Sequence, residues 1–356
     1  MDRIECAVIP GDGIGPEVIR EGRRVLEAAA EVDGGLAFAF REFPWGCRYY
    51  LEHGAMMPGD GLRALESFDA IYLGAVGYPG VPDHVSLWGL LLPIRRGFEQ
   101  YVNLRPVKLL RGIESPLRGR AGADIDFVCV RENTEGEYSN SGGRLHVGTP
   151  HEVAVQNAVF TRHGTERIIR YAFELARRSR RRLTSATKSN GINYSMVFWD
   201  EVFRQVGEAY PDVEAQLVHV DALAAFFVTR PQSFDVVVGS NLFGDILTDL
   251  GGAIAGGIGI APSANLNPEG RYPSLFEPVH GSAPDIAGKG IANPIGAVWT
   301  AALMLEHLRR PQLAALVMEA VQEVLAEGRV RTPDLGGTST TTEVGEAVAQ
   351  RVRKRG

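Results

Sequence analysis

The sequence predicts an α/β protein with a largely parallel sheet, and three observations support that fold class. Short runs rich in β-branched and aromatic residues alternate with longer periodic runs along most of the 356 residues, as strands and helices do in parallel sheets. The composition, 45% hydrophobic and 22% charged, is ordinary for a globular protein. The length exceeds what one hydrophobic core usually supports, so we expect two domains.

The individual elements follow from the length and periodicity of the apolar runs. A short apolar run predicts a strand, whereas a run of about ten or more residues with helical periodicity predicts a helix. Proline at a first position and basic residues at an end mark helix boundaries. We expect strands at 4–9, 36–43, 69–74, 126–130, 183–188, 215–220 and 235–239. We expect helices at 16–30, 161–178, 192–209, 294–308, 311–327 and 342–353.

Composition also narrows the class of function. A formal net charge of -6 argues against a general nucleic-acid binder. The three cysteines, Cys6, Cys47 and Cys129, form no CxxC pair, which disfavours a disulfide framework or a thiolate zinc site. We see no cleavable signal and no apolar stretch long enough to span a bilayer. We therefore expect a soluble cytoplasmic protein that binds neither nucleic acid nor membranes.

Two acidic residues one helical turn apart are the first candidate site. Asp245 and Asp249 lie in NLFGDILTDLGG, directly after the apolar strand FDVVVGS. Side chains at i and i+4 share a helix face, and their hard oxygens suit Mg²⁺ or Mn²⁺ rather than Zn²⁺. Such a pair is most often a solvated face, but the following GGAIAGG is too apolar and small for one. We predict a divalent metal site, with Asp221 after the strand 215–220 as a candidate third ligand.

Two glycine-rich segments are candidates for binding a nucleotide. In PGDGIGPEV, Pro16 occupies the place of the third glycine of G-x-G-x-x-G, so we do not read this turn as a Rossmann pyrophosphate site. The segment Glu277–Pro294 is a rigid irregular loop whose glycine N–H groups, at positions 281, 288 and 290, can face a ligand. Asp285 could bind an adenosine ribose and repel a 2′-phosphate, which would select NAD over NADP. An ordered connecting loop fits the pattern equally well.

Three arginines beside apolar segments suggest an anionic substrate. Arg95, Arg105 and Arg131 lie in LLLPIRR, YVNLRPV and DFVCVRE. Buried guanidinium groups need anionic partners, and three that converge would hold a substrate with two carboxylates. Tyr138 and Lys188 are candidates for an acid and a base. Taken singly, each of these residues is more often structural.

Taken together, these motifs resemble the β-decarboxylating dehydrogenases, the family of isocitrate, isopropylmalate and tartrate or D-malate dehydrogenases. The resemblance covers nearly the whole chain, and FPWGCRYYLEHG and DHVSLWGLLLPIRR are similar to the tartrate and D-malate branch. Gly89 stands where isocitrate enzymes have a serine. Leu91 and Leu92 could line an apolar pocket for 3-isopropylmalate, although Trp88 would crowd it. The motifs that carry the resemblance are, in order, PGDGIGPEV, NLRP, VRENTEGEY, TKSN, HVDA, NLFGDILTD, EPVHGSAPDIAGKGIANP and DLGGTSTT.

The resemblance implies a fold and an assembly. The fold would be an isopropylmalate dehydrogenase-like open sheet in which the chain crosses twice between two domains. Residues 1–102 and 258–356 would form a large domain with the NAD loop, and 103–257 the second domain. The stretch 140–157 looks like a dimerisation arm, and the implied homodimer shares its active sites. Lys188 and Asp221 would then serve the partner's metal.

The resemblance also implies roles for individual residues. Arg95, Arg105 and Arg131 would bind the substrate, and Asp221, Asp245 and Asp249 would bind Mn²⁺ or Mg²⁺. Lys188 would be the base, and Tyr138 would protonate carbon. NAD would be bound by Glu277, His280, Gly281, Ser282, Ala283, Asp285, Ile286 and Asn293. A monovalent cation, K⁺, is a further candidate cofactor.

The implied activity is NAD-dependent oxidation of a small 2-hydroxy dicarboxylate, D-malate or tartrate, either alone or together with loss of CO₂. Two alternatives stay open at this point. The protein could prefer 3-isopropylmalate, or it could be a catalytically silent regulatory subunit of the same family. Silent subunits typically depart at catalytic positions. Because Tyr138, Lys188 and the three aspartates are all in place, the sequence favours an active enzyme.

Overall fold

The computed structural model describes residues 2–355, which form two compact units. The first unit contains the residues up to Gln100, Lys108–Gly122 and the residues from Gly252 onward. The second contains Tyr101–Val107 and Ala123–Gly251. Both ends of the chain therefore belong to one unit, and 108–122, expected in the second domain, groups with the first. Strands and helices alternate through most of the chain, which confirms the predicted α/β class.

In the first unit, buried strands build a mixed sheet segment in the order β2-β1-β3-β12-β11. The central strand β1, Asp2–Gly11, pairs in parallel with β2, Leu36–Glu42, and with β3, Ala70–Ala75. Strand β12, Ser274–Pro278, runs parallel to β3 and antiparallel to β11, Pro262–Leu266. Every residue of β3 is buried, as expected for an inner strand that is covered on both faces.

The helices of the first unit include three long C-terminal ones that the sequence predicted. Helix α10, Ile295–His307, is buried over most of its length, in agreement with its nearly continuous apolar sequence. The other two C-terminal helices are α11, Pro311–Glu327, and α12, Thr341–Arg355. Helix α1, Gly15–Asp33, is the long N-terminal helix of this unit. Short helices that the sequence did not predict are α2, Cys47–His53, α3, Gly61–Leu65, α4, Asp83–Ser86, and α5, Leu92–Gly97. They are too short to show a helical period.

In the second unit, the strand order is β4-β5-β10-β8-β9. Strand β10, Val236–Gly239, pairs in parallel with β5, Asp126–Glu132, and with β8, Arg182–Thr187. Strand β9, Glu214–His219, runs parallel to β8, and β4 spans Val102–Lys108. The helices are α6, Arg162–Arg178, α7, Ser195–Gly207, α8, Val220–Thr229, and α9, Asn241–Ile254.

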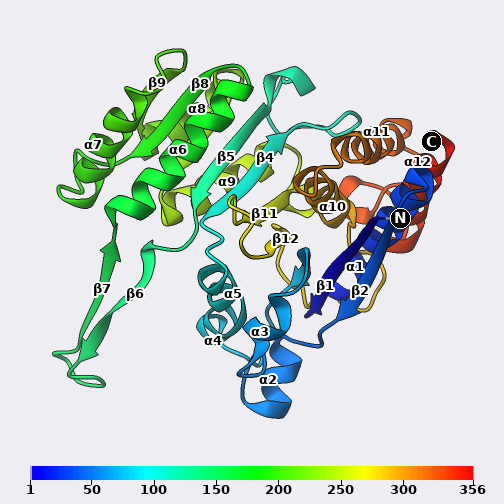
Figure 1. Ribbon diagram of the computed structural model, residues 1–356, viewed down its shortest axis with the longest axis horizontal. Helices are drawn as coiled ribbons and strands as arrows, with labels where there is room; N and C mark the ends of the chain where they lie inside the picture. Colours follow the sequence, from blue (N-terminus) through cyan, green and yellow to red (C-terminus); the bar gives the residue numbers. More distant parts are fainter. Residues whose placement is uncertain (1, 356) are drawn as a thin grey trace. The chain divides into compact units, whose positions relative to one another are not determined.

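An extended hairpin leaves the body of the second unit (Figure 1). Its strands, β6, Gly136–Leu145, and β7, Val153–Val159, pair only with each other in an antiparallel sheet. All seven residues of β7 are exposed, among them Val153, Val155 and Val159. Isolated two-stranded ribbons are marginally stable in water, so this exposed apolar ribbon is suited to pairing with another surface.

Candidate active site

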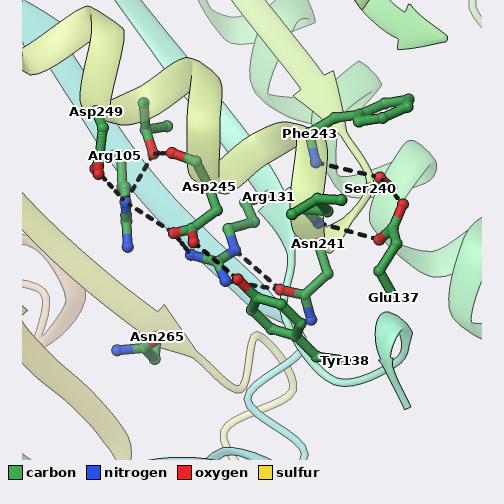
Figure 2. Close-up of polar contacts among 12 residues, drawn as sticks. Arg105, Arg131, Glu137, Tyr138, Ser240, Asn241, Phe243, Asp245, Asp249 and Asn265 are labelled. Carbon is green, nitrogen blue, oxygen red and sulfur yellow. Dashed lines mark hydrogen bonds and ion pairs between the residues drawn. The ribbon is translucent and has the colours of Figure 1, made fainter. Parts of the chain in front are cut away.

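Helix α9 of the second unit carries its two acidic residues on one face of the helix. Strand β10 ends at Gly239, and α9 begins two residues later at Asn241. Asp245 and Asp249 point from α9 toward the same arginine (Figure 2). Nη1 of Arg105, on β4, lies 3.6 Å from Oδ1 of Asp245 and 3.5 Å from Oδ1 of Asp249. The four-residue spacing therefore brings both carboxylates beside one guanidinium, and their binding of a metal stays a prediction.

Asp245 is the centre of this cluster because both of its carboxylate oxygens have strong donors. Nη1 of Arg131, on β5, forms a short ion pair with Oδ1 of Asp245. The hydroxyl of Tyr138 donates to Oδ2 at 3.0 Å. The guanidinium of Arg131 also lies 5.6 Å from the centre of the Tyr138 ring. The structure thus brings together Arg105, Arg131, Tyr138, Asp245 and Asp249.

The charge balance of the cluster is compatible with a hard divalent cation. Arg105 and Arg131 are buried, with 8% and 2% of their surface exposed, and they face two carboxylates. Burial raises the pKa of Asp249, an effect to which Asp245 adds and which Arg105 opposes. The side chains of Asp245 and Asp249 are 33% and 55% exposed. The carboxylates, which solvent can reach, could bind a divalent cation. The buried arginines beside them could bind the anion that the cation chelates.

Lys188 and Asp221 form a second pair in the same unit. Lys188 follows β8, Asp221 lies in the first turn of α8, and Nζ donates to Oδ1 at 2.6 Å. The hydrogen bond from Lys188 lowers the pKa of the Asp221 carboxyl. Among residues 2–355, no three acidic, histidine or cysteine side chains gather as a metal-binding group. Within one chain, Asp221 therefore does not complete the set with Asp245 and Asp249. That Asp221 binds the metal of a partner subunit stays a prediction.

The start of α9 is held by residues that the sequence analysis did not single out. The carboxylate of Glu137 accepts hydrogen bonds from the Ser240 hydroxyl, at 2.8 Å, and from the Leu242 amide, at 3.0 Å. Oδ1 of Asn241 accepts from Nε and Nη2 of Arg131, at 3.1 and 2.7 Å. These contacts, drawn in Figure 2, fix α9 against β5 and β6 and so set the place of Asp245. Only the serine before the helix was a local signal for such a cap.

Arg95, the third predicted substrate arginine, lies in the first unit and has its own carboxylate partner. Its Nη2 donates to Oε1 of Glu277 at 2.7 Å, and both side chains are buried. Asn265 donates to the same oxygen at 2.8 Å. The Nε of Arg95 is shielded from solvent and has no hydrogen-bond partner among the described residues. An unpaired buried donor of this kind is costly unless a ligand satisfies it.

The loop after β12 carries the residues predicted for NAD. His280 is shielded, burial lowers its pKa, and its Nε2 has no hydrogen-bond partner within residues 2–355. Asp285 is exposed and Ile286 is half-buried. Asn293 is engaged within the protein, since its Nδ2 donates to Asp334 at 2.9 Å and its Oδ1 accepts from the Ile295 amide at 3.0 Å. The unpaired histidine nitrogen and the exposed acid are compatible with a polar ligand at this loop.

One expectation about this loop is wrong. The N–H groups of Gly288 and Gly290 were expected to face a ligand, but both donate to the carboxylate of Glu17, at 2.5 and 3.0 Å. Their glycines are needed for backbone conformation, because φ is 77° at Gly288 and 67° at Gly290. A carboxylate of the protein itself therefore occupies the place that the sequence analysis gave to a ligand.

A hollow beside the loop was not foreseen. The segment 76–83 and three loop residues, Gly281, Ser282 and Pro284, line an open space of about 640 Å³. Such a volume lies within the range of small-molecule and cofactor sites. The sequence signal for it was the glycine and proline-rich run GYPGVP, which marks irregular backbone without indicating what it lines.

The second unit thus holds a cluster of carboxylates and arginines, groups that could bind a cation and an anion. Residues 5–348 match the isocitrate/isopropylmalate dehydrogenase family. The chain belongs to this family and is an oxidoreductase. The resemblance stated from the motifs is thereby confirmed, and so is the predicted fold.

Relatives that align with this chain over nearly their whole length extend the comparison. The chain is 59% identical to a probable tartrate dehydrogenase/decarboxylase of Bacillus subtilis (strain 168), over 99% of each chain. It is 57% identical to the D-malate dehydrogenase [decarboxylating] of Escherichia coli (strain K12), over 98% of this chain and 99% of the other. A crystal structure of isocitrate dehydrogenase from Methylococcus capsulatus superposes with a TM-score of 0.89 at 36% identity, covering 98% of this chain and 99% of that one.

No helix in the described part of the chain, residues 2–355, is long and apolar enough to cross a membrane.

Proposed function

We propose that this protein is a cytoplasmic, NAD-dependent and Mn²⁺- or Mg²⁺-dependent dehydrogenase that oxidises and decarboxylates D-malate or tartrate. The observation that carries the proposal is the meeting of Asp245 and Asp249 with Arg105, Arg131 and Tyr138 in one cluster. Metal-chelating carboxylates next to carboxylate-binding arginines match a substrate with a hydroxyl beside a carboxylate. The names of the relatives at 59% and 57% identity support the same substrates.

The chain's own residues supply binding and proton transfer. Arg105 and Arg131 would hold the substrate carboxylates by paired hydrogen bonds. Asp245 and Asp249 would hold the cation, which supplies Lewis acidity that favours loss of the hydroxyl proton. In the balanced reaction, C2 would give a hydride to NAD, the 2-hydroxyl would give its proton to Lys188 of the partner subunit, and the bond to the β-carboxylate would break to release CO₂. Tyr138, whose hydroxyl already contacts the acid cluster, would protonate the carbon left behind.

The loop of the first unit would bind NAD. The unpaired Nε2 of His280 and the exposed Asp285 are polar groups of this loop, and Asp285 would repel the 2′-phosphate of NADP. The hollow lined by 76–83, Gly281 and Ser282 offers room for part of the dinucleotide. The remaining predicted contacts, Glu277, Ala283, Ile286 and Asn293, belong to the same proposal.

A homodimer would complete the site. Lys188 and Asp221 form a pair apart from the Asp245 cluster in one chain, so a shared site would bring them to the metal of the partner subunit. The exposed apolar residues of β6 and β7 give the surface for such an assembly. Shared residues would make the dimer the smallest active form.

The packing at Gly89 supports small substrates over isocitrate. A Cβ at Gly89 would lie 2.5 Å from Cγ of Met56, a side chain that is only 2% exposed. The serine that isocitrate enzymes have at this position would therefore require Met56 to move. The centre of the nearby Trp88 ring lies 4.8 Å from the Arg96 guanidinium. This contact keeps a large ring in the segment where isopropylmalate enzymes would need space.

The experiment is a comparison of kcat/KM for NAD reduction with D-malate, tartrate, isocitrate and 3-isopropylmalate in the presence of Mn²⁺. We expect D-malate or tartrate to give the highest value, release of CO₂ in step with NADH, and loss of activity when Mn²⁺ is chelated. A highest value with 3-isopropylmalate would overturn the substrate. No reduction with any 2-hydroxy diacid would favour a silent subunit.

A further inference from the structure

The glycine-rich turn near the N-terminus packs directly against the proposed NAD loop, although its sequence does not fit a pyrophosphate site. Gly13 has a φ of 59°, and a Cβ there would lie 1.9 Å from the carbonyl oxygen of Ser282. The amide of Ile14 donates to that same oxygen at 2.8 Å. Position 13 therefore requires glycine, because the backbone of the proposed NAD loop lies too close for a side chain.

Glu17 continues this contact from the first turn of α1. One of its carboxylate oxygens accepts from the Gly288 amide at 2.5 Å, and the other accepts from the Gly290 amide at 3.0 Å. Charged acceptors make the stronger hydrogen bonds. The contact joins residues 271 and 273 positions apart in the sequence. The side chain of Glu17 thus fixes the backbone of two loop glycines that have a left-handed conformation.

The loop is anchored again from α12. The amide of Thr341 donates to the Gly290 carbonyl at 2.8 Å, and its hydroxyl donates to the Ala292 carbonyl at 2.6 Å. Apolar contacts lie between the anchors, where Ile286 and Ala287 pack against a small core that includes Ile14. Asp285 lies in the stretch between the Ser282 anchor and the Glu17 anchor. Its backbone is therefore held at both ends.

We propose that Glu17 is a positioning residue for the nucleotide loop and that its carboxylate fixes 285–290 in the shape that presents Asp285 to the ribose of NAD. The inference rests on the proposed function, because it takes this loop as the NAD site. Without Glu17 the two glycines regain conformational freedom, and NAD must order the segment when it binds. Affinity for NAD falls, while the acid and arginine cluster on α9, β4 and β5 keeps its contacts.

The test compares Glu17→Gln with Glu27→Gln, a matched control at an exposed position of the same helix. Glutamine keeps one acceptor oxygen and turns an NH₂ group toward the second glycine amide, so it cannot make both bonds. We expect Glu17→Gln to weaken NADH binding by about tenfold, as judged from the usual worth of a hydrogen bond to a charged group. KM for NAD should rise equally, with kcat and KM for the hydroxy acid nearly unchanged.

Hydrogen exchange gives a readout that does not depend on activity. In the protein without nucleotide, the amides of 285–290 should exchange faster in Glu17→Gln than in wild type or in Glu27→Gln, while α9 keeps its protection. Unchanged exchange and unchanged NADH affinity would overturn the inference. Faster exchange throughout the first unit would also overturn it, because Glu17 would then support the whole fold rather than the loop.

A third variant separates this inference from the proposed function. If Asp285→Asn weakens NADH binding and Glu17→Gln does not, only the positioning role fails. If Asp285→Asn leaves NADH affinity unchanged, the loop is not the ribose site and the proposed NAD site fails. Weaker NADH binding in both variants, with Glu27→Gln like wild type, supports the two together.

Discussion

At the scale of single residues, Asp245 is the carboxylate that the two arginines and the tyrosine of the cluster share. Its carboxylate contacts Arg131 and Tyr138 through different oxygens and lies near Arg105. A substrate carboxylate could take over the arginine contacts, which would leave Asp245 available to the cation. The acid would therefore organise the site before substrate arrives and bind the metal afterwards.

Asp245→Asn is expected to weaken Mn²⁺ binding by at least about tenfold and to reduce kcat by more than about a hundredfold. The reason is that a hard cation binds a charged carboxylate oxygen more strongly than a neutral amide oxygen. Mn²⁺ titration by electron paramagnetic resonance with D-malate present, and steady-state kinetics at saturating metal, would measure the two effects. Asp60→Asn, at an exposed position of the first unit, is the control. Wild-type turnover of the Asp245 variant at limiting Mn²⁺ would remove this residue from the site.

The sequence identified the residues whose signal is local and missed those whose partners are remote. Asp245 and Asp249 are found from their spacing and from the apolar sequence around them, and the apolar neighbours of Arg131 indicate that it is buried. Glu137 is 103 residues from Ser240, and Glu17 is 271 residues from Gly288. No local pattern predicts such pairs, since only the folded sheets bring them together.

At the scale of elements, α9 depends on a cap that comes from another segment. Glu137, on β6, accepts the Leu242 amide in the first turn of α9 and the Ser240 hydroxyl just before it. A carboxylate at this end also interacts favourably with the helix dipole. Because Asp245 is in the next turn, a frayed start of α9 would displace the acid cluster.

Glu137→Gln should lower the free energy of unfolding by about 1 kcal/mol, the usual size of a lost N-terminal cap, and should also reduce affinity for Mn²⁺. Urea unfolding and metal titration would measure these changes. Glu201→Gln, at an exposed position of α7, serves as the control. A stability loss with no change in metal affinity would contradict the link from the cap to Asp245.

Long elements with strong patterns were predicted well, and elements without one were not. Helix α11 has the predicted bounds, Pro311–Glu327, because its proline start and apolar period are both present. Helix α8 was missed, since it begins at Val220, directly after β9, and the predicted strand ran on to that residue. The sequence therefore placed Asp221 after a strand but not in the first turn of a helix.

At the scale of the whole molecule, stability should depend on pH through two half-buried histidines. Burial lowers the pKa of His307, whose ring lies 5.5 Å from that of Phe276, and burial lowers that of His280 too. The unfolded chain then binds more protons than the folded one just below the unfolded pKa of about 6.5. This contribution to stability is full above that pKa and is lost as the pH falls through it.

His307→Gln should flatten this dependence. The fall in the free energy of unfolding between pH 7.5 and pH 5.5, about one unit on either side of the unfolded pKa, should be smaller in the variant than in wild type. Urea unfolding at the two values would measure it, with His151→Gln in the exposed hairpin as the control. An equal fall in both proteins would show that His307 does not carry the effect.

Activity should depend on the assembly through the β6–β7 hairpin. Val155→Asp places a charge among exposed apolar residues of this ribbon and should give a folded monomer, because an unpaired charge in an apolar interface is costly. Size-exclusion chromatography with light scattering would give the mass, and the NAD reduction assay would give the activity. We expect the monomer to be inactive. A monomer with wild-type turnover would contradict the shared active site.

The most direct test of the whole account is the anomalous scattering of manganese in crystals of the enzyme grown with D-malate. We expect one strong peak per subunit, bound by Asp245 and Asp249 of that subunit and by Asp221 of the partner subunit, with the substrate carboxylates on Arg105 and Arg131. Manganese bound elsewhere, with these carboxylates turned away from it, would contradict the account.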